Sequence, residues 1–223
     1  MPVMTPTTHL EVLDAAEHMP LGSVLVVNDF SWEEYELLLQ DLDERRNPRL
    51  SYDCGRLEVV STSSHHDRSG WFIDKLIWEF CALRGLTLLG CGHATWKSKQ
   101  AAKGAEGDLS YYVANEPRVR RKHNITLESD PPPDVVVEID LTTDSSRKLS
   151  IYAGLGVPEV WRYDGHSYHF YRLTDGKYTE VPSSRCLPGL SSPLLLEALA
   201  SRDTLAPVEV VKVFRRLLKK LKK

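Results

Sequence analysis

Membrane-spanning and disulfide-bonded folds have little support in this sequence of 223 residues. No apolar run approaches the roughly 18 residues that a membrane-spanning helix requires. Residues 1–8 lack the basic and then apolar pattern of a secretory signal peptide. The four cysteines include no Cys-X-X-Cys pair, so neither a disulfide framework nor a zinc site is indicated. We therefore expect a soluble, cytoplasmic protein whose cysteines are buried, reduced thiols.

The net charge is small but unevenly distributed. It is −3, and the 42% hydrophobic and 26% charged residues are typical of a globular domain rather than of a disordered chain. Residues 212–223 carry seven basic residues and no acid, so the rest of the chain sums to −10. An acidic body with a basic tail is compatible with nucleic-acid binding but does not require it.

The hydrophobic periodicity predicts strands flanked by helices, which indicates an α/β or α+β fold with a mixed central sheet. A capping box at Ser31 and Glu34 begins the first strong helix. We divide the chain into a lead-in at 1–27, a main domain at 28–190 and a C-terminal helical extension with the basic tail at 191–223. The predicted helices are 32–45, 66–84, 144–153, 193–200 and 207–221. The predicted strands are 24–27, 50–53, 57–61, 86–89, 108–113 (half-buried), 134–141, 158–163, 166–173 and 177–182. The last three are expected to form a meander. Residues 95–105 are expected to be a Lys-rich connection.

The strand predicted at 134–141 is the most apolar one and carries the most informative side chains. Because side chains alternate along a strand, Glu138 and Asp140 lie on the same face. Carboxylates are almost never buried without a partner, and a divalent cation would offset both their desolvation and their mutual repulsion. Oxygen ligands alone favour Mg²⁺, Mn²⁺ or Ca²⁺ over Zn²⁺. An exposed strand end, where both acids are simply hydrated, explains the pair equally well.

Two further residues complete a pattern around these acids. Lys148 lies in the helix predicted after the strand, which Thr142 or Thr143 can cap, and we expect it off the apolar face of that helix. Helical side chains lean toward the N-terminus, so its ammonium group points toward the strand end. Asp108 opens the strand predicted at 108–113. Taken singly, an exposed lysine and a turn aspartate are the simpler interpretations.

These residues occur in the order acid, then acid-X-acid about thirty residues later, then lysine. This order resembles that of the PD-(D/E)XK nuclease superfamily. Within it, the chain resembles the Uma-two family of restriction-endonuclease-like proteins, over about residues 28–182. The segments that carry the resemblance are FSWEEY at 30–35, GRLEVVS at 55–61 followed by His66, GAEGDLSYYV at 104–113, PPDVVVEID at 132–140, KLSIY at 148–152 and GVPEVW at 156–161.

The resemblance implies a restriction-endonuclease-like core in which Asp108 and Glu138 hold Mg²⁺ or Mn²⁺ for the hydrolysis of phosphodiester bonds in DNA. Two positions depart from the family pattern. Gly107 replaces the proline before the first acid, which we expect to leave the chemistry unchanged. Asp140 replaces the lysine expected two residues after the glutamate, and it is a further candidate metal ligand. Lys148 stands where the family often supplies the lysine, and we expect it to orient the attacking water or to neutralise charge on the phosphate.

Several other residues are candidates for supporting roles. Glu58 and His66 match recurring family positions near the site, and a structural hydrogen-bonding role suits each of them at least as well. A basic loop could contact phosphate groups or be simply solvated. Its members are Arg118, Arg120, Arg121 and Lys122.

Two functions remain open at this stage. The first is a metal-dependent DNA endonuclease, expected as a homodimer because cutting two strands favours two sites related by a twofold axis. The second is an inactive nuclease-fold protein that binds nucleic acid or a protein partner. Asp140 in place of lysine favours the second function, and Lys148 favours the first.

Overall fold

The computed structural model describes residues 8–42, 48–141, 144–202 and 204–220. Within these ranges the chain has the predicted mixed α and β architecture, with two sheets and seven helices. The candidate caps Thr142 and Thr143 lie outside the described residues, as do 1–7 of the lead-in and 43–45 of the first predicted helix. No helix in the described part of the chain is long and apolar enough to cross a membrane.

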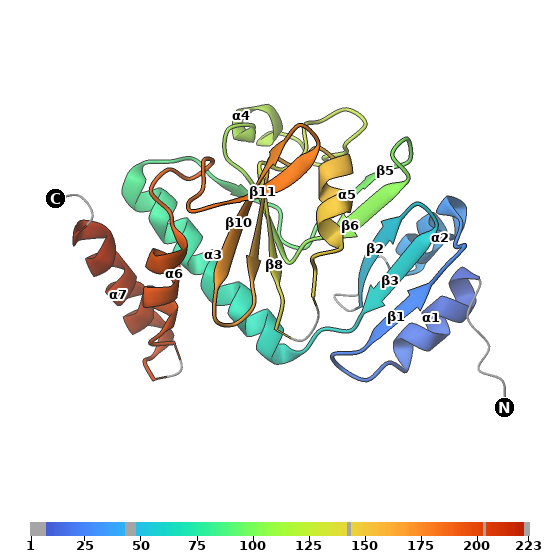
Figure 1. Ribbon diagram of the computed structural model, residues 1–223, viewed down its shortest axis with the longest axis horizontal. Helices are drawn as coiled ribbons and strands as arrows, with labels where there is room; N and C mark the ends of the chain where they lie inside the picture. The colour runs from blue at the N-terminus through green and yellow to red at the C-terminus, as the bar shows by residue number, and fades with distance from the viewer. Residues whose placement is uncertain (1–7, 43–47, 142–143, 203, 221–223) are drawn as a thin grey trace.

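The larger sheet forms the centre of the molecule (Figure 1). Its strand order is β11 (Lys177–Val181), β10 (Tyr168–Thr174), β9 (Glu159–Tyr163), β8 (Val135–Ile139), β7 (Leu109–Tyr112) and β4 (Leu89–Gly90). The sheet is mixed, because β8 and β9 are parallel whereas the other neighbours are antiparallel. All five residues of β8 are buried, as expected for a strand covered on both faces.

Helices cover both faces of the larger sheet. One face carries α3 (Ser64–Arg84), α6 (Ser192–Leu199) and α7 (Pro207–Lys220), and the other carries α5 (Lys148–Gly154). The predicted alternation of β8 is confirmed, because Val135 and Val137 pack with α3 whereas Val136 packs with Ile151 and Tyr152 of α5. Figure 1 shows α3 crossing the sheet and α5 standing between the larger sheet and the smaller one.

The smaller, antiparallel sheet lies at the N-terminal end of the molecule (Figure 1). Its strand order is β1 (Val24–Val27), β3 (Arg56–Val60), β2 (Arg49–Asp53), β6 (Lys103–Glu106) and β5 (Thr95–Ser98), and it packs with α1 (His9–Glu17) and α2 (Trp32–Leu42). At the start of α2, Ser31 Oγ accepts a hydrogen bond from the Glu34 N–H at 3.1 Å. The Glu34 carboxylate does not complete the capping box at Ser31; it accepts the backbone N–H of His9 at 2.6 Å and so ties α1 to α2.

The expectation of a Lys-rich connection at 95–105 is wrong, because this segment forms the β5–β6 hairpin. Lysine, glycine and alanine have low strand propensity, so the local sequence gives no sign of β6. Pairing with β2 holds β6 in place. A side chain at Gly104 would collide with Tyr35, which explains the glycine inside a strand.

Other local expectations also need correction. The lead-in at 1–27 contains α1, which Thr8 and Glu11 begin with a complete capping box. The strand expected at 86–89 is reduced to β4. The strand expected to be half-buried at 108–113 is β7, which is buried on both faces. Cys54 is exposed and not buried as expected; it lies in the turn between β2 and β3, with a positive φ of 47°.

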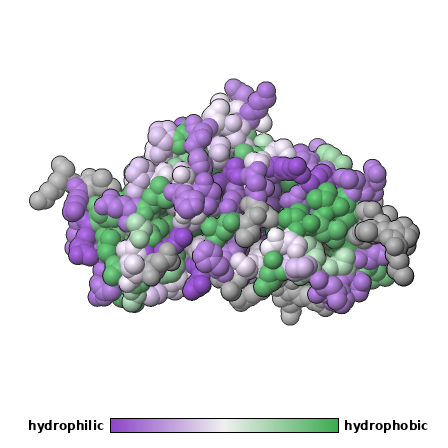
Figure 2. Space-filling model, turned by 60° about the horizontal axis from the view of Figure 1, so that its bottom comes forward, coloured by the Kyte–Doolittle hydropathy of each residue, from purple (hydrophilic) through white to green (hydrophobic). Residues whose placement is uncertain are grey.

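The surface is mixed in character. On the face shown in Figure 2, hydrophobic side chains gather toward the two ends of the molecule and polar side chains separate them. Exposed apolar residues at the α1–β1 end include Leu10 (62% exposed), Leu21 (69%) and Val24 (44%). At the C-terminal end, Val208 at the start of α7 is 65% exposed.

Helix α7 of the C-terminal extension packs into the hydrophobic core through Val210, Phe214 and Leu218. Phe214 of α7 is fully buried in the cluster that contains α3 and α6. We expect Phe214→Ala to lower the free energy of unfolding by about 3–5 kcal/mol, because it leaves a cavity in this cluster. Urea denaturation measures this loss. Val208→Ala is the control and should change stability by no more than about 0.5 kcal/mol; equal effects of the two variants would contradict the packing of α7 on the body.

Candidate active site

The two acids that the sequence singles out lie side by side in the larger sheet. Asp108 directly precedes β7 and Glu138 lies in β8, and Leu109 of β7 is opposite Val137 of β8. The Asp108 N–H donates to the Val137 carbonyl at 3.1 Å, so the pairing of the strands extends as far as the first acid. Asp108 is only 4% exposed and Glu138 only 2%. For Glu138 and Asp140, the pair for which the sequence left a hydrated strand end open, the low exposure of Glu138 and of the Asp140 side chain (6%) rules that alternative out.

Both acids line one pocket, to which the two sheets and two helical segments contribute. The smaller sheet supplies Arg49 and Glu58, α3 supplies His66 and α5 supplies Lys148. The other lining residues are Val60, Ser61, Thr62, Asp108, Glu138, Ile139, Asp140, Asp144 and Ser145. The structure therefore brings together all the residues predicted as catalytic or supporting, although they come from segments between 58 and 148.

Asp108 is held by donors on two sides. His66 Nε2 lies 3.1 Å from Asp108 Oδ2, and the Ile139 N–H donates to the same oxygen at 2.8 Å. Burial alone would raise the pKa of Asp108, but the hydrogen bond and charge of His66 outweigh it and hold that pKa below its usual range. The same contact raises the pKa of His66 against the opposing effect of burial. Asp108 is thus an ionised carboxylate, and His66 is its direct partner.

Glu138 accepts hydrogen bonds from two residues of α5. Lys148 Nζ donates to Glu138 Oε2 at 2.9 Å and also to the Glu106 carbonyl at 3.2 Å, and the Tyr152 hydroxyl donates to Glu138 Oε1. Burial raises the pKa of Glu138 to about 7, despite the opposing charge of Lys148. Burial would lower the pKa of Lys148, but the charges of Glu138 and Asp108 raise it above its usual value. Lys148 is therefore a buried ammonium group.

The position of Lys148 on its helix differs from the sequence prediction. The helix predicted from residue 144 begins at Lys148 itself. Lys148 and Tyr152 are four residues apart and share one face of α5, so Lys148 lies on the buried face and not off it. The contact of the Tyr152 hydroxyl with Glu138 depends on how α5 packs over β8.

Asp140 occupies the usual position of the lysine and is bound by protein groups. Its Oδ1 accepts the Ser145 N–H at 3.1 Å, and its Oδ2 accepts Arg162 Nε at 2.8 Å. Arg162 lies opposite Glu138 on the parallel strand β9 and also pairs with Asp144. This group of charges fixes the segment that leads from β8 to α5, and therefore the start of the helix that carries Lys148. Arg162 was missed because nothing in its local sequence reveals a partner twenty-two residues away.

Glu58, another lining acid, lies in β3 and pairs with Arg56 Nη2 at 2.9 Å. Arg49, at the start of β2, is only 6% exposed, and its Nε has no hydrogen-bond partner among the described residues. Arg49 was not predicted as a site residue, because a single arginine at a strand start carries no local signal of burial.

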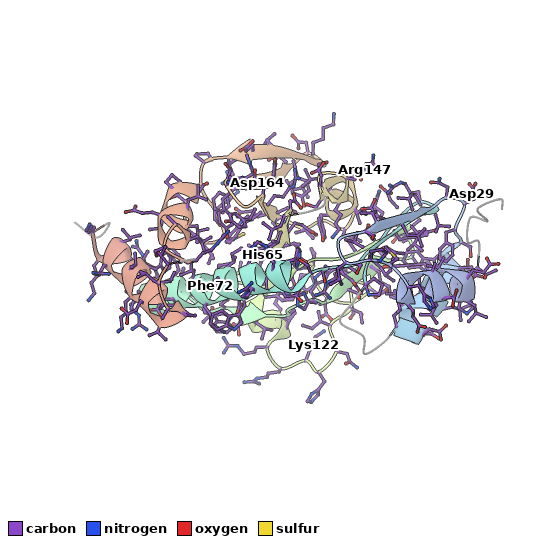
Figure 3. The ribbon with its side chains drawn as sticks, turned by 90° about the horizontal axis from the view of Figure 1, so that it is seen from below. Asp29, His65, Phe72, Lys122, Arg147 and Asp164 are labelled. Atoms are coloured by element: carbon purple, nitrogen blue, oxygen red, sulfur yellow. The ribbon has the colours of Figure 1, made fainter. Side chains whose placement is uncertain are left out.

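The structure does not bring the basic loop to this pocket. The loop includes α4 (Glu116–Val119) and is tied to the start of β8, where Asn115 donates to Asp134. Asp134, which directly precedes β8, lies four residues and so about 13 Å from Glu138, at the strand rise of about 3.3 Å per residue. In Figure 3, Lys122 extends away from α3 on the side opposite Arg147. Two of the four basic residues have acidic partners, Arg120 with Glu116 and Lys122 with Asp130.

The donor set of the pocket suits a hard divalent cation. No preformed cluster of three or more His, Cys, Asp or Glu ligands occurs among the described residues. Asp108 and Glu138 nevertheless face the same pocket, and each carboxylate can accept about four hydrogen bonds or metal contacts, of which two are described. The Ile139 N–H points toward Asp108, and the carbonyl of the same residue lies on the same strand edge. Oxygen ligands of this kind suit a hard divalent cation such as Mg²⁺, Mn²⁺ or Ca²⁺.

The glycine at position 107 is explained by close packing. A Cβ at this position would lie 2.6 Å from Val136 Cγ1 and 3.4 Å from the Tyr152 hydroxyl oxygen. A larger residue would therefore push against the hydroxyl group that holds Glu138. The glycine permits the approach of α5 to the acids.

Comparison with known proteins gives a family match and a similar solved structure. The Uma2 family model, described as "Putative restriction endonuclease", matches residues 32–207. The crystal structure described as a putative nuclease belonging to DUF820, from Anabaena variabilis, is similar with a TM-score of 0.46 and 13% sequence identity, covering 94% of this chain and 99% of that chain. No curated protein matches the chain.

Proposed function

Because the chain belongs to the Uma2 family, we propose that it is a metal-dependent endonuclease that hydrolyses phosphodiester bonds in DNA. Families with a restriction-endonuclease-like core generally use divalent metals, and Mg²⁺ or Mn²⁺ suits the ligands present. One observation carries the proposal: the buried Lys148 ammonium group lies against Glu138, in a pocket that Glu138 shares with Asp108. An acid pair with an adjacent lysine is the set of groups that the reaction needs, and the lysine comes from α5 instead of position 140.

Each residue of the pocket has a distinct task in this proposal. A divalent ion bound by Asp108 and Glu138 would supply Lewis acidity and lower the pKa of a bound water. His66 and the Ile139 N–H orient Asp108, and Tyr152 orients Glu138. Lys148 stabilises the negative charge that develops on the phosphate.

Asp140 has a structural task in the proposal. Three hydrogen bonds to Asp140 are described, one from Ser145 and two from Arg162, against two to each of Asp108 and Glu138, and the Arg162 guanidinium group already balances its charge. We therefore assign metal binding to Asp108 and Glu138 and give Asp140 and Arg162 the task of holding the start of α5. If Asp140 were instead a third metal ligand, as the sequence suggested, Asp140→Asn would weaken metal binding as strongly as Asp108→Asn.

The direct test is metal binding together with cleavage. We expect Mn²⁺ to bind the wild-type protein in a calorimetric titration and supercoiled plasmid to be nicked in Mg²⁺ or Mn²⁺ but not in EDTA. Asp108→Asn should lose both, because it removes a charged ligand. A wild-type protein that binds no divalent ion would contradict the enzyme proposal and favour the alternative, a nuclease-fold protein that binds nucleic acid or a partner without cutting. Asp140 in place of lysine is the feature that favours this alternative.

The expected homodimer remains a prediction with its own measurement. Cutting two strands of a duplex is served by two copies of the site related by a twofold axis. Size-exclusion chromatography with light scattering gives the mass in solution, and a mass of one chain at assay concentrations would contradict the prediction.

A further inference from the structure

A second pocket lies beside the acid pair, and we call it the flanking pocket. It has a volume of about 330 Å³ and shares Arg49, His66 and Asp108 with the pocket described above. Its other wall is the first part of α3, where it is lined by Trp71; this stretch of α3 lies between His65 and Phe72, which are labelled in Figure 3. A volume of this size is within the range of pockets that bind small molecules.

Arg49 gives the flanking pocket an unsatisfied cationic donor. The residue is only 6% exposed, it lines both pockets, and its buried Nε has no hydrogen-bond partner among the described residues. A buried donor without an acceptor costs free energy. A phosphate group would satisfy it, because the guanidinium fork matches two phosphate oxygens.

Trp71 gives the same pocket an exposed aromatic surface. It is 49% exposed, whereas the other tryptophans that pack in the cores, such as Trp96 and Trp161, are 3% and 0% exposed. Lys75 Nζ lies 5.8 Å from the centre of the Trp71 ring. Every nucleobase has a flat face that can stack on such a ring, whatever its sequence.

The acidic residues of the flanking pocket already have partners. Asp74 accepts the Tyr111 hydroxyl at 2.9 Å and Lys75 Nζ at 3.2 Å, and Asp67 lies 3.5 Å from His66 Nδ1. Asp108 is held by His66 and the Ile139 N–H. Arg49 is thus the charged residue of the pocket lining that has a hydrogen-bond donor without an acceptor. The flanking pocket therefore favours an anionic ligand.

We propose that the flanking pocket holds one nucleotide of the substrate strand, with its phosphate on Arg49 and its base stacked on Trp71. This inference rests on the proposed nuclease function, because it places the nucleotide directly beside the acid pair. A base reaches Trp71 only after leaving its own stack. The pocket therefore selects single-stranded or unstacked nucleic acid over a regular duplex.

The test is binding in EDTA, where metal-dependent cleavage is absent. The probes are a fluorescein-labelled oligothymidylate, the corresponding oligouridylate and a blunt duplex of equal length, followed by fluorescence anisotropy. We expect the single strands to bind more tightly than the duplex. Trp71→Ala should weaken single-strand binding about 5- to 150-fold, and Trp71→Phe should restore most of it. Trp78→Ala is the matched control, because Trp78 lies two turns further along α3, is 43% exposed and does not line the pocket.

Arg49 gives a second, independent readout. Arg49→Gln should weaken binding and reduce the slope of log affinity against log salt by about 0.7, the value for one phosphate contact on a single strand. Trp71→Ala should leave that slope unchanged, because stacking releases no counterions. Arg49→Lys keeps the charge and should keep the slope, so it also serves if Arg49→Gln fails to fold.

The outcomes separate this inference from the nuclease proposal. If the wild type cleaves plasmid but Trp71→Ala and Arg49→Gln bind as the wild type does, the flanking pocket is not a nucleotide site and the nuclease proposal stands. If the wild type cleaves nothing but binds single strands through Trp71, the nucleotide site stands without the nuclease. Absence of single-strand binding by the wild type, or equal losses in Trp71→Ala and Trp78→Ala, overturns the inference. A difference between the thymidylate and uridylate probes shows which nucleic acid the pocket prefers.

Discussion

Glu138→Gln is expected to reduce metal-dependent cleavage to the background of the assay while leaving the fold intact. Glutamine keeps the size of the side chain and an acceptor for Lys148 or Tyr152, which both hydrogen-bond to Glu138. It removes the negative charge that a hard divalent cation requires of its ligands. Nicking of supercoiled plasmid in Mg²⁺ and in Mn²⁺ measures the loss, and far-ultraviolet circular dichroism checks the fold.

The control for this variant is the same change at an exposed acid. Glu180→Gln, on the edge strand β11 with its side chain 57% exposed, should cleave as the wild type does. If Glu138→Gln nicks plasmid as fast as the wild type and Glu180→Gln, the activity lies elsewhere in the protein or comes from a contaminant. Loss of activity in both variants would indicate a general effect of charge and not a ligand role for Glu138.

The parts of the site that sequence reasoning recovered follow short-range rules. Alternation along β8 gives the face of Glu138, and the order of Asp108, Glu138 and Lys148 gives their family positions. The structure confirms that these three side chains share one pocket. Their catalytic and metal-binding roles remain predictions, which the variants described above test.

The parts that sequence reasoning missed depend on contacts between distant segments. Nothing in the local sequence links Tyr152 to Glu138, since only the packing of α5 over β8 brings its hydroxyl there. Arg162 reaches Asp140 across the parallel pairing of β8 and β9. Arg49 comes from the smaller sheet, and its burial arises where that sheet meets α3 and β8. Such long-range pairings have no periodic signature in a single sequence.

The basic loop illustrates the opposite error. A run of basic residues at 118–122 suggests a phosphate-binding surface, yet the fold places it at the start of β8, away from the acids at the other end of the strand. Several of these charges are used locally, because Arg120 and Lys122 pair with Glu116 and Asp130. A cation buried in the pocket, such as Arg49, is better evidence of a phosphate-binding site than an exposed basic residue in a loop.

Lys148→Ala is expected to lower the cleavage rate about 10²- to 10³-fold, because it removes a group that stabilises transition-state charge. Mn²⁺ affinity should change little, since lysine supplies no oxygen ligand. Arg147→Ala is the matched control: Arg147 is the exposed neighbour of Lys148 just before α5 (Figure 3), and its removal should be nearly silent. Single-turnover nicking rates and calorimetric titration with Mn²⁺ measure the two effects separately.

These two measurements also decide how Lys148 acts. Its Nζ is bonded to Glu138 Oε2 and the Glu106 carbonyl, so it could act on the phosphate or by positioning Glu138. A lower rate with unchanged Mn²⁺ affinity supports direct action on the phosphate. A parallel loss of rate and Mn²⁺ affinity makes Lys148 a positioning residue for the ligand Glu138. If Lys148→Ala cleaves as fast as Arg147→Ala, a lysine supplied by α5 does not replace the one that Asp140 displaced, and the catalytic role assigned to Lys148 is wrong.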